Sequence, residues 1–181
     1  MKNTTIFIVA IIIAGGSGFA LQKSIHQQPP QMQSQGDAVI GQSRPEFAAP
    51  DVDGQLRNIK EWDDDVIVLN FWATWCPPCL KEIPEFIELQ AAYSNQGVQF
   101  IGLAIDDENA VRQYVEEVGM NYPSLVVDID GINLAKRYGN DIGALPYTVI
   151  IDRDGEISDT ITGELSKIRT KELLEKQGIQ L

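Results

Sequence analysis

The sequence predicts one α/β domain in which helices cover both faces of a largely parallel sheet. Short apolar runs, typical of strands buried on both faces, alternate with segments whose apolar residues recur every three or four positions, as in amphipathic helices. Strands that alternate with helices are usually joined by right-handed crossovers, which make neighbouring strands parallel. With 181 residues and 44% apolar content, the chain can bury one sizeable core and carry a short appendage.

The appendage is expected at the N-terminus, in two parts. Residues 1–21 contain sixteen consecutive uncharged residues, Ile6 to Leu21, which fit either a membrane anchor or a signal peptide cleaved after Ala20. Residues 22–43 hold seven glutamines and almost no large apolar side chain, so we expect a flexible tether. The folded domain is then expected at residues 44–181.

The net charge of the chain argues against some classes of binding partner. The net charge is −12, and residues 1–43 carry only Lys2, Lys23 and Asp37, so the acidic excess belongs to the domain. Phosphate contacts need Lys and Arg side chains, and an acidic surface therefore argues against nucleic acid and anionic lipid as partners. Beyond this exclusion, the charge indicates only solubility.

The first elements of the domain are short. Phe47 to Leu56 reads as two short strands around an Asp-Gly turn, and Asn58 to Trp62 as a helical turn. A strand buried on both faces is expected at Val66 to Trp72, a mostly apolar run of seven residues that follows three aspartates.

The segment after this strand predicts a long helix. Apolar residues recur at three- and four-residue steps from Ile83 to Ala91, so the helix should run from about Cys76 to about Ser94. Pro84 lies inside it and should kink it, because proline removes one intrahelical hydrogen bond and crowds the preceding turn.

The remaining elements continue the alternation. Gly97 and Gly119 are expected to end helices, and Ser166 is expected to cap the last one. Strands are expected at 98–105, 124–127 and 145–152, and an antiparallel edge strand at 156–162. Helices are expected at 132–138 and 167–176, and another should start at the acids of 106–108 and stop at Gly119.

The two cysteines, Cys76 and Cys79, stand where the buried strand meets the helix N-terminus. The free N–H groups and partial positive charge of a helix N-terminus favour a thiolate, which is the reactive form of a thiol. We expect Cys76 to be the exposed nucleophile and Cys79 the more buried thiol that resolves a mixed disulfide. Because Pro77 and Pro78 have no N–H, only the Cys79 amide can donate to the Cys76 sulfur, which favours a weakly stabilised thiolate and a reducing pair.

Two other uses of this pair have to be weighed. A structural disulfide that closes a four-residue loop would stabilise the fold by only about 2 kcal/mol. A zinc site usually has four ligands, but the chain has two cysteines, and its one histidine, His26, lies in the polar tether. Redox chemistry without a metal or other cofactor is therefore the preferred interpretation.

Taken together, these motifs resemble a known family. Asn70 to Cys79, read with Pro84 and with Ala144 to Thr148, is similar to the TlpA/ResA-like branch of the thioredoxin superfamily, over about residues 44–177. The resemblance implies a thioredoxin-like fold with an N-terminal β-hairpin extension and a central strand-helix insertion, the latter formed by the elements expected at 124–138.

The resemblance also implies a substrate-binding surface. Pro146 would be the cis-proline of the fold, lying across from Cys76, and the backbone of Leu145 would pair with an extended substrate chain. Trp75 and Pro77 would complete this surface. The alternative is that Pro146 is an ordinary proline at the start of a strand, and the surrounding motif favours the cis-proline.

Proton transfer is assigned to Glu82, which coincides with a glutamate of the ResA-like pattern. Lying three residues after Cys79, it could exchange protons with that thiol. The alternative is an ordinary acid that gains from the helix dipole. Asn70 departs from ordinary thioredoxins, which carry a buried aspartate at this position, so protons would have to come from Glu82 or from water.

The implied function is that of an extracytoplasmic enzyme that reduces protein disulfides, with apocytochrome c as a candidate client. Its electrons would come from a membrane dithiol donor of the DsbD/CcdA type. The protein would be a monomer, held at the cell inner membrane by an uncleaved anchor with its domain in the periplasm, or secreted to the periplasm if the segment is cleaved.

Two alternatives remain. A thiol peroxidase of related fold would have a threonine three residues before a lone peroxidatic cysteine, whereas Thr74 stands two residues before Cys76. The other is a non-catalytic assembly or chaperone module for apocytochrome c.

Overall fold

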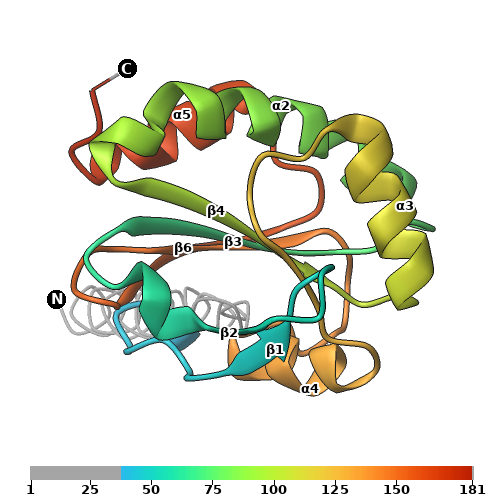
Figure 1. Cartoon of the computed structure of the whole chain (residues 1–181). Coiled ribbons are helices and arrows are strands. Elements are labelled where there is room, and N and C mark those ends of the chain that lie inside the picture. The colour runs from blue at the N-terminus through green and yellow to red at the C-terminus, as the bar shows by residue number, and fades with distance from the viewer. Residues whose placement is uncertain (1–37, 181) are drawn as a thin grey trace, which may run out of the picture. The chain divides into compact units, whose positions relative to one another are not determined.

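The computed structural model describes residues 38–180, which form a central sheet with helices on both faces (Figure 1). A separate two-stranded hairpin lies beside the sheet. The strand order in the sheet is β5-β4-β3-β6-β7. The strands are β1 (Ala48–Pro50), β2 (Leu56–Asn58), β3 (Val66–Trp72), β4 (Val98–Ala104), β5 (Ser124–Val126), β6 (Tyr147–Ile151) and β7 (Ile157–Thr162).

The helices form the outer layers. Figure 1 shows α2, α3 and α5 on one face of the sheet, and α4 with the hairpin β1-β2 on the other. The helices are η2 (Ile59–Trp62), α2 (Pro77–Tyr93), η3 (Ser94–Gln96), α3 (Glu108–Val118), α4 (Asp130–Arg137) and α5 (Lys167–Lys176). The hairpin and the β5-α4 pair are the N-terminal extension and the central insertion that the sequence predicted.

Strand β3 is the centre of the domain. All seven of its residues are buried, as the apolar run predicted. It pairs in parallel with β4 and antiparallel with β6. On one face, Val66 and Val68 pack with apolar side chains of α2 and α5, and on the other Ile67 and Leu69 pack with the hairpin and α4 side. The strand thus carries two cores and ends, at Trp72, next to the cysteines.

The direction of β6 corrects the expectation of a largely parallel sheet. Only β3, β4 and β5 are parallel, whereas β6 and β7 each run antiparallel to their neighbours. Helix α4 has eight residues, so it is about 12 Å long, while the seven-residue β3 spans about 23 Å. The chain therefore does not return along α4 to the other end of the sheet, and β6 starts at the edge where β5 ends.

The local predictions are confirmed to within a few residues. Helix α2 starts at Pro77 and ends at Tyr93 with Pro84 inside it, and the kink at Pro84 stays a prediction. Gly119 ends α3 with φ of +64°, a left-handed conformation that glycine adopts without strain. Ser166 caps α5 by accepting a hydrogen bond from the Arg169 N–H.

The domain begins earlier than the sequence indicated. Residues 38–43 were assigned to the tether, but Gly41 and Gln42 exchange backbone hydrogen bonds with Ile157, and Ser43 forms a bridge with Glu156. Val39 also packs against the core. The start of β7 has an open edge, and these backbone groups satisfy it.

The predicted anchor and most of the predicted tether lie outside the described residues. Within residues 38–180, the structure contains no helix of the length and apolarity needed to cross a membrane.

Candidate active site

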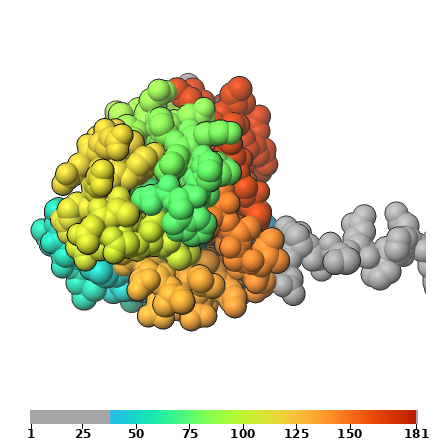
Figure 2. Space-filling view, turned by 90° about the vertical axis from the view of Figure 1, so that its right-hand side faces the viewer, coloured from blue at the N-terminus to red at the C-terminus, as the bar shows by residue number. Residues whose placement is uncertain are grey.

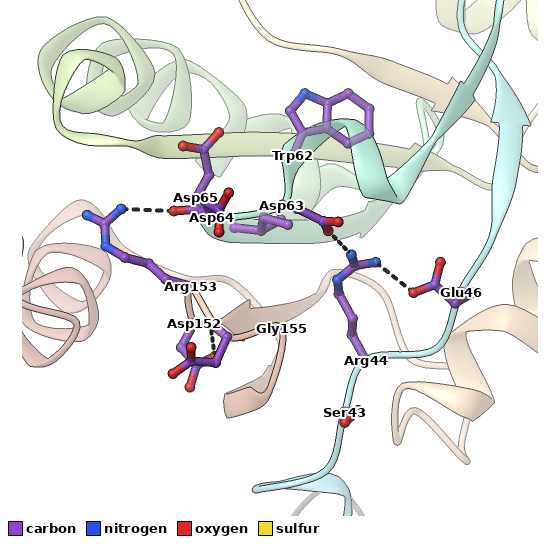
Figure 3. Close-up of a pocket in the computed structure, with 12 residues that line it drawn as sticks. Ser43, Arg44, Glu46, Trp62, Asp63, Asp64, Asp65, Asp152, Arg153 and Gly155 are labelled. Atoms are coloured by element: carbon purple, nitrogen blue, oxygen red, sulfur yellow. Dashed lines mark hydrogen bonds and ion pairs between the residues drawn. The ribbon is translucent and has the colours of Figure 1, made fainter.

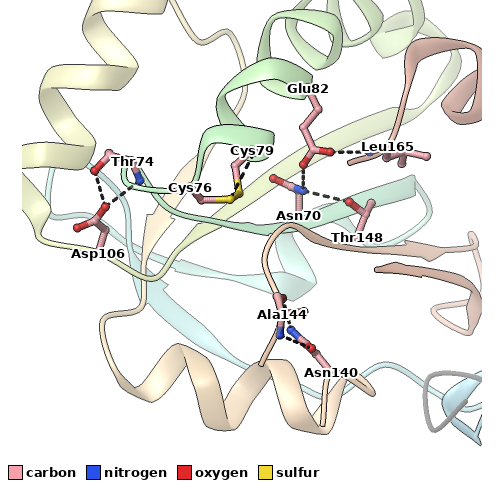
Figure 4. Close-up of a disulfide and its surroundings, with 10 residues drawn as sticks. All are labelled: Asn70, Thr74, Cys76, Cys79, Glu82, Asp106, Asn140, Ala144, Thr148 and Leu165. Atoms are coloured by element: carbon pink, nitrogen blue, oxygen red, sulfur yellow. Dashed lines mark hydrogen bonds between the residues drawn. A yellow bond between two sulfur atoms is a disulfide. The ribbon is translucent and has the colours of Figure 1, made fainter. Parts of the chain in front are cut away.

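Cys76 and Cys79 form a disulfide at the junction of β3 and α2 (Figure 4). Their Cα atoms are 5.3 Å apart. Cys76 is the N-cap of α2, so its sulfur lies at the end of the helix whose N–H groups are free. The structure therefore represents the oxidised form of the pair.

The hydrogen bonding of Cys76 agrees with the prediction made from the two prolines. Among residues 38–180, only the Cys79 N–H donates to the Cys76 sulfur, with a nitrogen-sulfur distance of 3.4 Å. Pro77 and Pro78 occupy the next two positions and have no N–H to offer. The helix N-terminus thus supplies a single direct donor to this sulfur.

The expectation that Cys76 is exposed is wrong for this oxidised form. Cys76 is 4% exposed and Cys79 is fully buried. Both belong to an apolar cluster with Trp72 and Ala73, against which Leu145 packs from the loop before β6. Packing from both sides explains the burial, although Cys76 remains the outer of the two cysteines.

The predicted substrate-binding residues divide into exposed and buried groups. Trp75, next to Cys76, is 65% exposed, and Pro77 is also exposed. Leu145 is half-buried and Pro146 is buried, and the peptide bond between them is cis, as the resemblance implied. Of these four residues, Trp75 and Pro77 therefore present apolar surface to solvent, and Leu145 does so in part.

Glu82 lies inside the domain. It is 1% exposed, and its carboxylate accepts hydrogen bonds from Asn70 Nδ2 at 2.8 Å and from the Leu165 N–H at 2.7 Å. Asn70 Nδ2 also donates to Thr148 Oγ1 at 3.0 Å (Figure 4). Glu82 is therefore not exposed to solvent, and its carboxylate is held by β3 and by the segment before α5.

Burial raises the pKa of Glu82 to about 7. The hydrogen bonds from Leu165 and Asn70 lower the pKa and only partly offset the loss of solvation, while the charges of Glu164 and Glu85 raise it further. A carboxyl group with this pKa can hold or release a proton near neutral pH. Its position, one turn along α2 from Cys79, keeps the proton-transfer role open as a prediction.

Two polar side chains near the cysteines were missed by the sequence analysis. Asp106 Oδ2 accepts hydrogen bonds from Thr74, two residues before Cys76, through both the backbone N–H at 2.8 Å and Oγ1 at 2.5 Å. An acid directly after the second buried strand was the available signal, because the C-terminal ends of parallel strands share one edge.

Asn140 is the second missed residue. It is buried, its Nδ2 donates to the Ala144 carbonyl at 2.8 Å, and its Oδ1 accepts from the Ala144 N–H at 3.1 Å. Ala144 directly precedes Leu145 and Pro146, so Asn140 holds the loop that faces the disulfide (Figure 4). No pattern in the sequence marks this asparagine as buried.

These features converge at one edge of the sheet. Because β3, β4 and β5 are parallel and β6 is antiparallel, the C-terminal ends of the first three and the start of β6 lie together. Figure 2 views the domain toward this edge, with the segment that starts α2 between α3 and the loop that leads into β6.

A cavity of about 410 Å³ lies at the opposite edge, next to the start of β3 (Figure 3). In its lining, Arg44 forms ion pairs with Asp63 and Glu46, and Arg153 donates to the backbone carbonyl of Asp64. In the part of the chain that the structure describes, no three His, Cys, Asp or Glu side chains are grouped to hold a metal.

Comparison with known proteins gives a consistent result. Residues 40–176 match the Redoxin family. The chain is 35% identical, over 179 residues that cover 97% of each sequence, to the thiol-disulfide oxidoreductase ResA of Bacillus thuringiensis (strain Al Hakam). It is also similar to two solved structures from Chlorobium tepidum.

One of these structures is a thiol:disulfide interchange protein of the thioredoxin family, with a TM-score of 0.69, 28% identity, and coverage of 75% of this chain and 94% of that one. The other is a putative thiol:disulfide interchange protein DsbE, with a TM-score of 0.66, 27% identity, and coverage of 76% and 94%. These similarities confirm the expected thioredoxin-like fold.

Proposed function

Because the chain belongs to the ResA-like thiol-disulfide oxidoreductases of the Redoxin family, we propose that it reduces disulfide bonds of client proteins outside the cytoplasm, with Cys76 as nucleophile and Cys79 as resolving thiol. The observation that carries this proposal is the disulfide at the N-terminus of α2, whose outer sulfur receives one N–H donor. One donor stabilises a thiolate less than several would, which favours giving electrons over taking them.

The reaction proceeds in two exchanges. The Cys76 thiolate attacks one sulfur of the client disulfide, forms a mixed disulfide and expels the other client sulfur as a thiolate. The Cys79 thiolate then attacks the Cys76 sulfur, which releases the second client thiolate and forms the Cys76-Cys79 disulfide. The client gains two electrons, and the pair ends in the oxidised form.

Glu82 is the proposed proton carrier of the second exchange. Cys79 is buried and must lose its proton before it can attack. Glu82 stands one helical turn further along α2, and its pKa of about 7 allows it to accept that proton at neutral pH. Asn70 is neutral and cannot serve as a base, so its role is to orient the Glu82 carboxylate.

The client is proposed to contact the exposed side of the site. Trp75 and Pro77 offer apolar surface beside Cys76, and the backbone of Leu145, before Pro146, would pair with an extended client segment. The similarity to ResA and to a putative DsbE supports thiol-disulfide exchange with a protein client. Apocytochrome c, and with it a role in cytochrome c maturation, is the candidate client that we propose.

The proposal also covers where the protein lies and which protein reduces it. An apolar segment at residues 6–21 would anchor the protein in the cell inner membrane, and residues up to 37 would tether the domain in the periplasm. A membrane dithiol protein of the DsbD/CcdA type would return the Cys76-Cys79 disulfide to the dithiol. We propose that the protein acts as a monomer.

A trapping experiment tests the function. Cys79→Ser should accumulate a mixed disulfide between Cys76 and a client, because the resolving thiol is missing, whereas Cys76→Ser should form none. Equilibration of the wild-type pair with glutathione should give a reduction potential well below the DsbA value of about −120 mV. A potential near that value would overturn the reductase assignment.

Two further measurements address the alternatives, one on the wild-type protein and one on Cys76→Ser. A thiol peroxidase would turn over hydrogen peroxide with a dithiol reductant faster than it reduces insulin. A non-catalytic assembly module would retain its biological activity in Cys76→Ser. Either result would replace the proposed function.

A further inference from the structure

The carboxylate of Asp106 bridges two segments of the active-site edge. Asp106 Oδ2 accepts from the Thr74 N–H at 2.8 Å and from Thr74 Oγ1 at 2.5 Å, while Asp106 Oδ1 accepts from the Asp107 N–H at 2.8 Å. Thr74 follows β3, and Asp106 follows β4, 32 residues later. The contact thus ties the segment that carries Cys76 to the end of the neighbouring strand (Figure 4).

The number of donors explains why a carboxylate stands at this position. Three donor groups converge on two oxygens, and an ionised carboxylate is an acceptor at both. An asparagine would offer one acceptor oxygen and would turn its amide N–H groups toward one of the donors. The site is therefore chemically specific for an acid, although the sequence around it contains several other acids.

The hydrogen bonds between Asp106 and Thr74 hold a tight turn. The Cys76 N–H donates to the Ala73 carbonyl at 3.2 Å, which closes a four-residue turn with Thr74 and Trp75 at its centre. Thr74 is the turn residue that Asp106 holds, and both its backbone and its hydroxyl are used. Fixing Thr74 restricts the positions of the exposed Trp75 and of Cys76, which follow it directly.

We propose that Asp106 is a positioning residue for thiol-disulfide exchange, which holds the Ala73–Cys76 turn through Thr74 and whose negative charge disfavours the Cys76 thiolate. This inference rests on the proposed function, since it assigns to Asp106 a part in the attack by Cys76. The position of the turn and the charge of Asp106 affect different measurable quantities. Loosening the turn should slow attack on a client, while removing the charge should lower the pKa of the Cys76 thiol.

Two substitutions separate these effects. Asp106→Asn removes the charge and one acceptor, so the Cys76 thiol pKa should fall by about half a unit to one unit, and insulin reduction should slow by about tenfold. Thr74→Val removes one hydrogen bond but keeps the Asp106 charge. It should slow insulin reduction without lowering the thiol pKa, and Thr74→Ser should restore the rate.

Asp107→Asn is the matched control. It makes the same change of charge one residue further on, but the Asp107 carboxylate caps α3 by accepting from the N–H groups of Asn109 and Ala110, whereas Thr74 donates to Asp106. Asparagine is an equally good N-cap, so the fold should be kept. We expect a rate within about twofold of wild type and a smaller change of the thiol pKa.

The thiol pKa is measured from the pH dependence of alkylation by iodoacetamide, in a Cys79→Ser background that leaves Cys76 as the reacting thiol. Equal pKa values and rates in Asp106→Asn and Asp107→Asn would overturn the inference. If the wild-type protein fails to reduce insulin, the proposed function fails, whereas the pKa comparison still tests the charge effect of Asp106. Should Asp106→Asn not fold, an unchanged rate in Thr74→Val would refute the positioning role.

Discussion

Asn70 and Glu82 meet inside the domain, where Asn70 Nδ2 donates to Glu82 Oε1 at 2.8 Å. Asn70 lies on the central strand β3 and Glu82 on α2, and both are buried. Ordinary thioredoxins, which this chain resembles, place a buried aspartate on the strand at the Asn70 position. Here the strand supplies the amide and the helix supplies the buried acid.

The buried acid predicts how stability changes with pH. Glu82 has a pKa of about 7 in the folded protein against 4.5 as its ordinary value. Below pH 4.5 it is protonated in both states. As pH rises to 7, the unfolded chain ionises first, so the free energy of unfolding falls. Glu82→Gln cannot ionise, so its stability relative to wild type should rise by up to about 3 kcal/mol between pH 4 and pH 8.

Denaturant unfolding of both oxidised proteins at pH 4, 6 and 8 measures this difference. Glu116→Gln is a control, because Glu116 is exposed on α3, and its stability difference from wild type should vary by less than about 0.5 kcal/mol over this pH range. A stability difference between Glu82→Gln and wild type that stays constant with pH would contradict the prediction.

The same group predicts the pH dependence of catalysis. If Glu82 accepts the Cys79 proton, Glu82→Gln should slow insulin reduction by about 10- to 100-fold at pH 7. The wild-type rate should rise as Glu82 ionises around pH 7, and this step should be missing in the variant. Rates recorded from pH 5 to pH 9 give the comparison, and superimposable profiles would remove Glu82 from the mechanism.

Loosening the loop before β6 should slow the reduction of a protein client more than exchange with a small dithiol. Asn140→Ala would leave the Ala144 N–H and carbonyl without their partner and should lower the free energy of unfolding by about 1 to 3 kcal/mol. Insulin reduction should slow more than exchange with dithiothreitol, because a small dithiol does not pair with a backbone. Asn133→Ala, at an exposed position of α4, is the control and should change neither quantity. Equal effects of the two substitutions would contradict the role of Asn140.

Removing the Trp75 side chain should weaken client binding without changing the stability of the fold. It is 65% exposed, so Trp75→Ala should alter the free energy of unfolding by less than about 0.5 kcal/mol. The KM for a protein client should rise severalfold, since an exposed aromatic ring is a frequent anchor of interfaces. Ile168→Ala removes an exposed apolar side chain on α5 and should leave KM unchanged. A KM in Trp75→Ala equal to that of this control would exclude Trp75 from the client surface.

Features encoded by neighbouring residues were predictable from the sequence. The buried run at Val66–Trp72, the helix after Cys76 and the helix end at Gly119 depend on residues within one or two turns of each other. The single N–H donor to the Cys76 sulfur follows from the covalent structure of two prolines. Local chemistry was sufficient in each case.

Features that join distant segments were decided by the tertiary structure. Glu82 accepts from Leu165, 83 residues later, and Thr74 donates to Asp106, 32 residues later. Neither partner is marked by its own neighbours, and the raised pKa of Glu82 follows from burial between two elements rather than from sequence spacing.

The sequence by itself therefore determined the strands, the helices and the position of the two cysteines between them. Only the tertiary structure decided the direction of β6, the pairing of residues 41–43 with the start of β7, and the burial of Cys76. It also decided which groups donate hydrogen bonds to the carboxylates of Glu82 and Asp106. The physical reason is that helix and strand formation depends on local backbone geometry and the period of apolar residues. Desolvation and hydrogen bonding of a side chain depend instead on which segments the completed fold places against it.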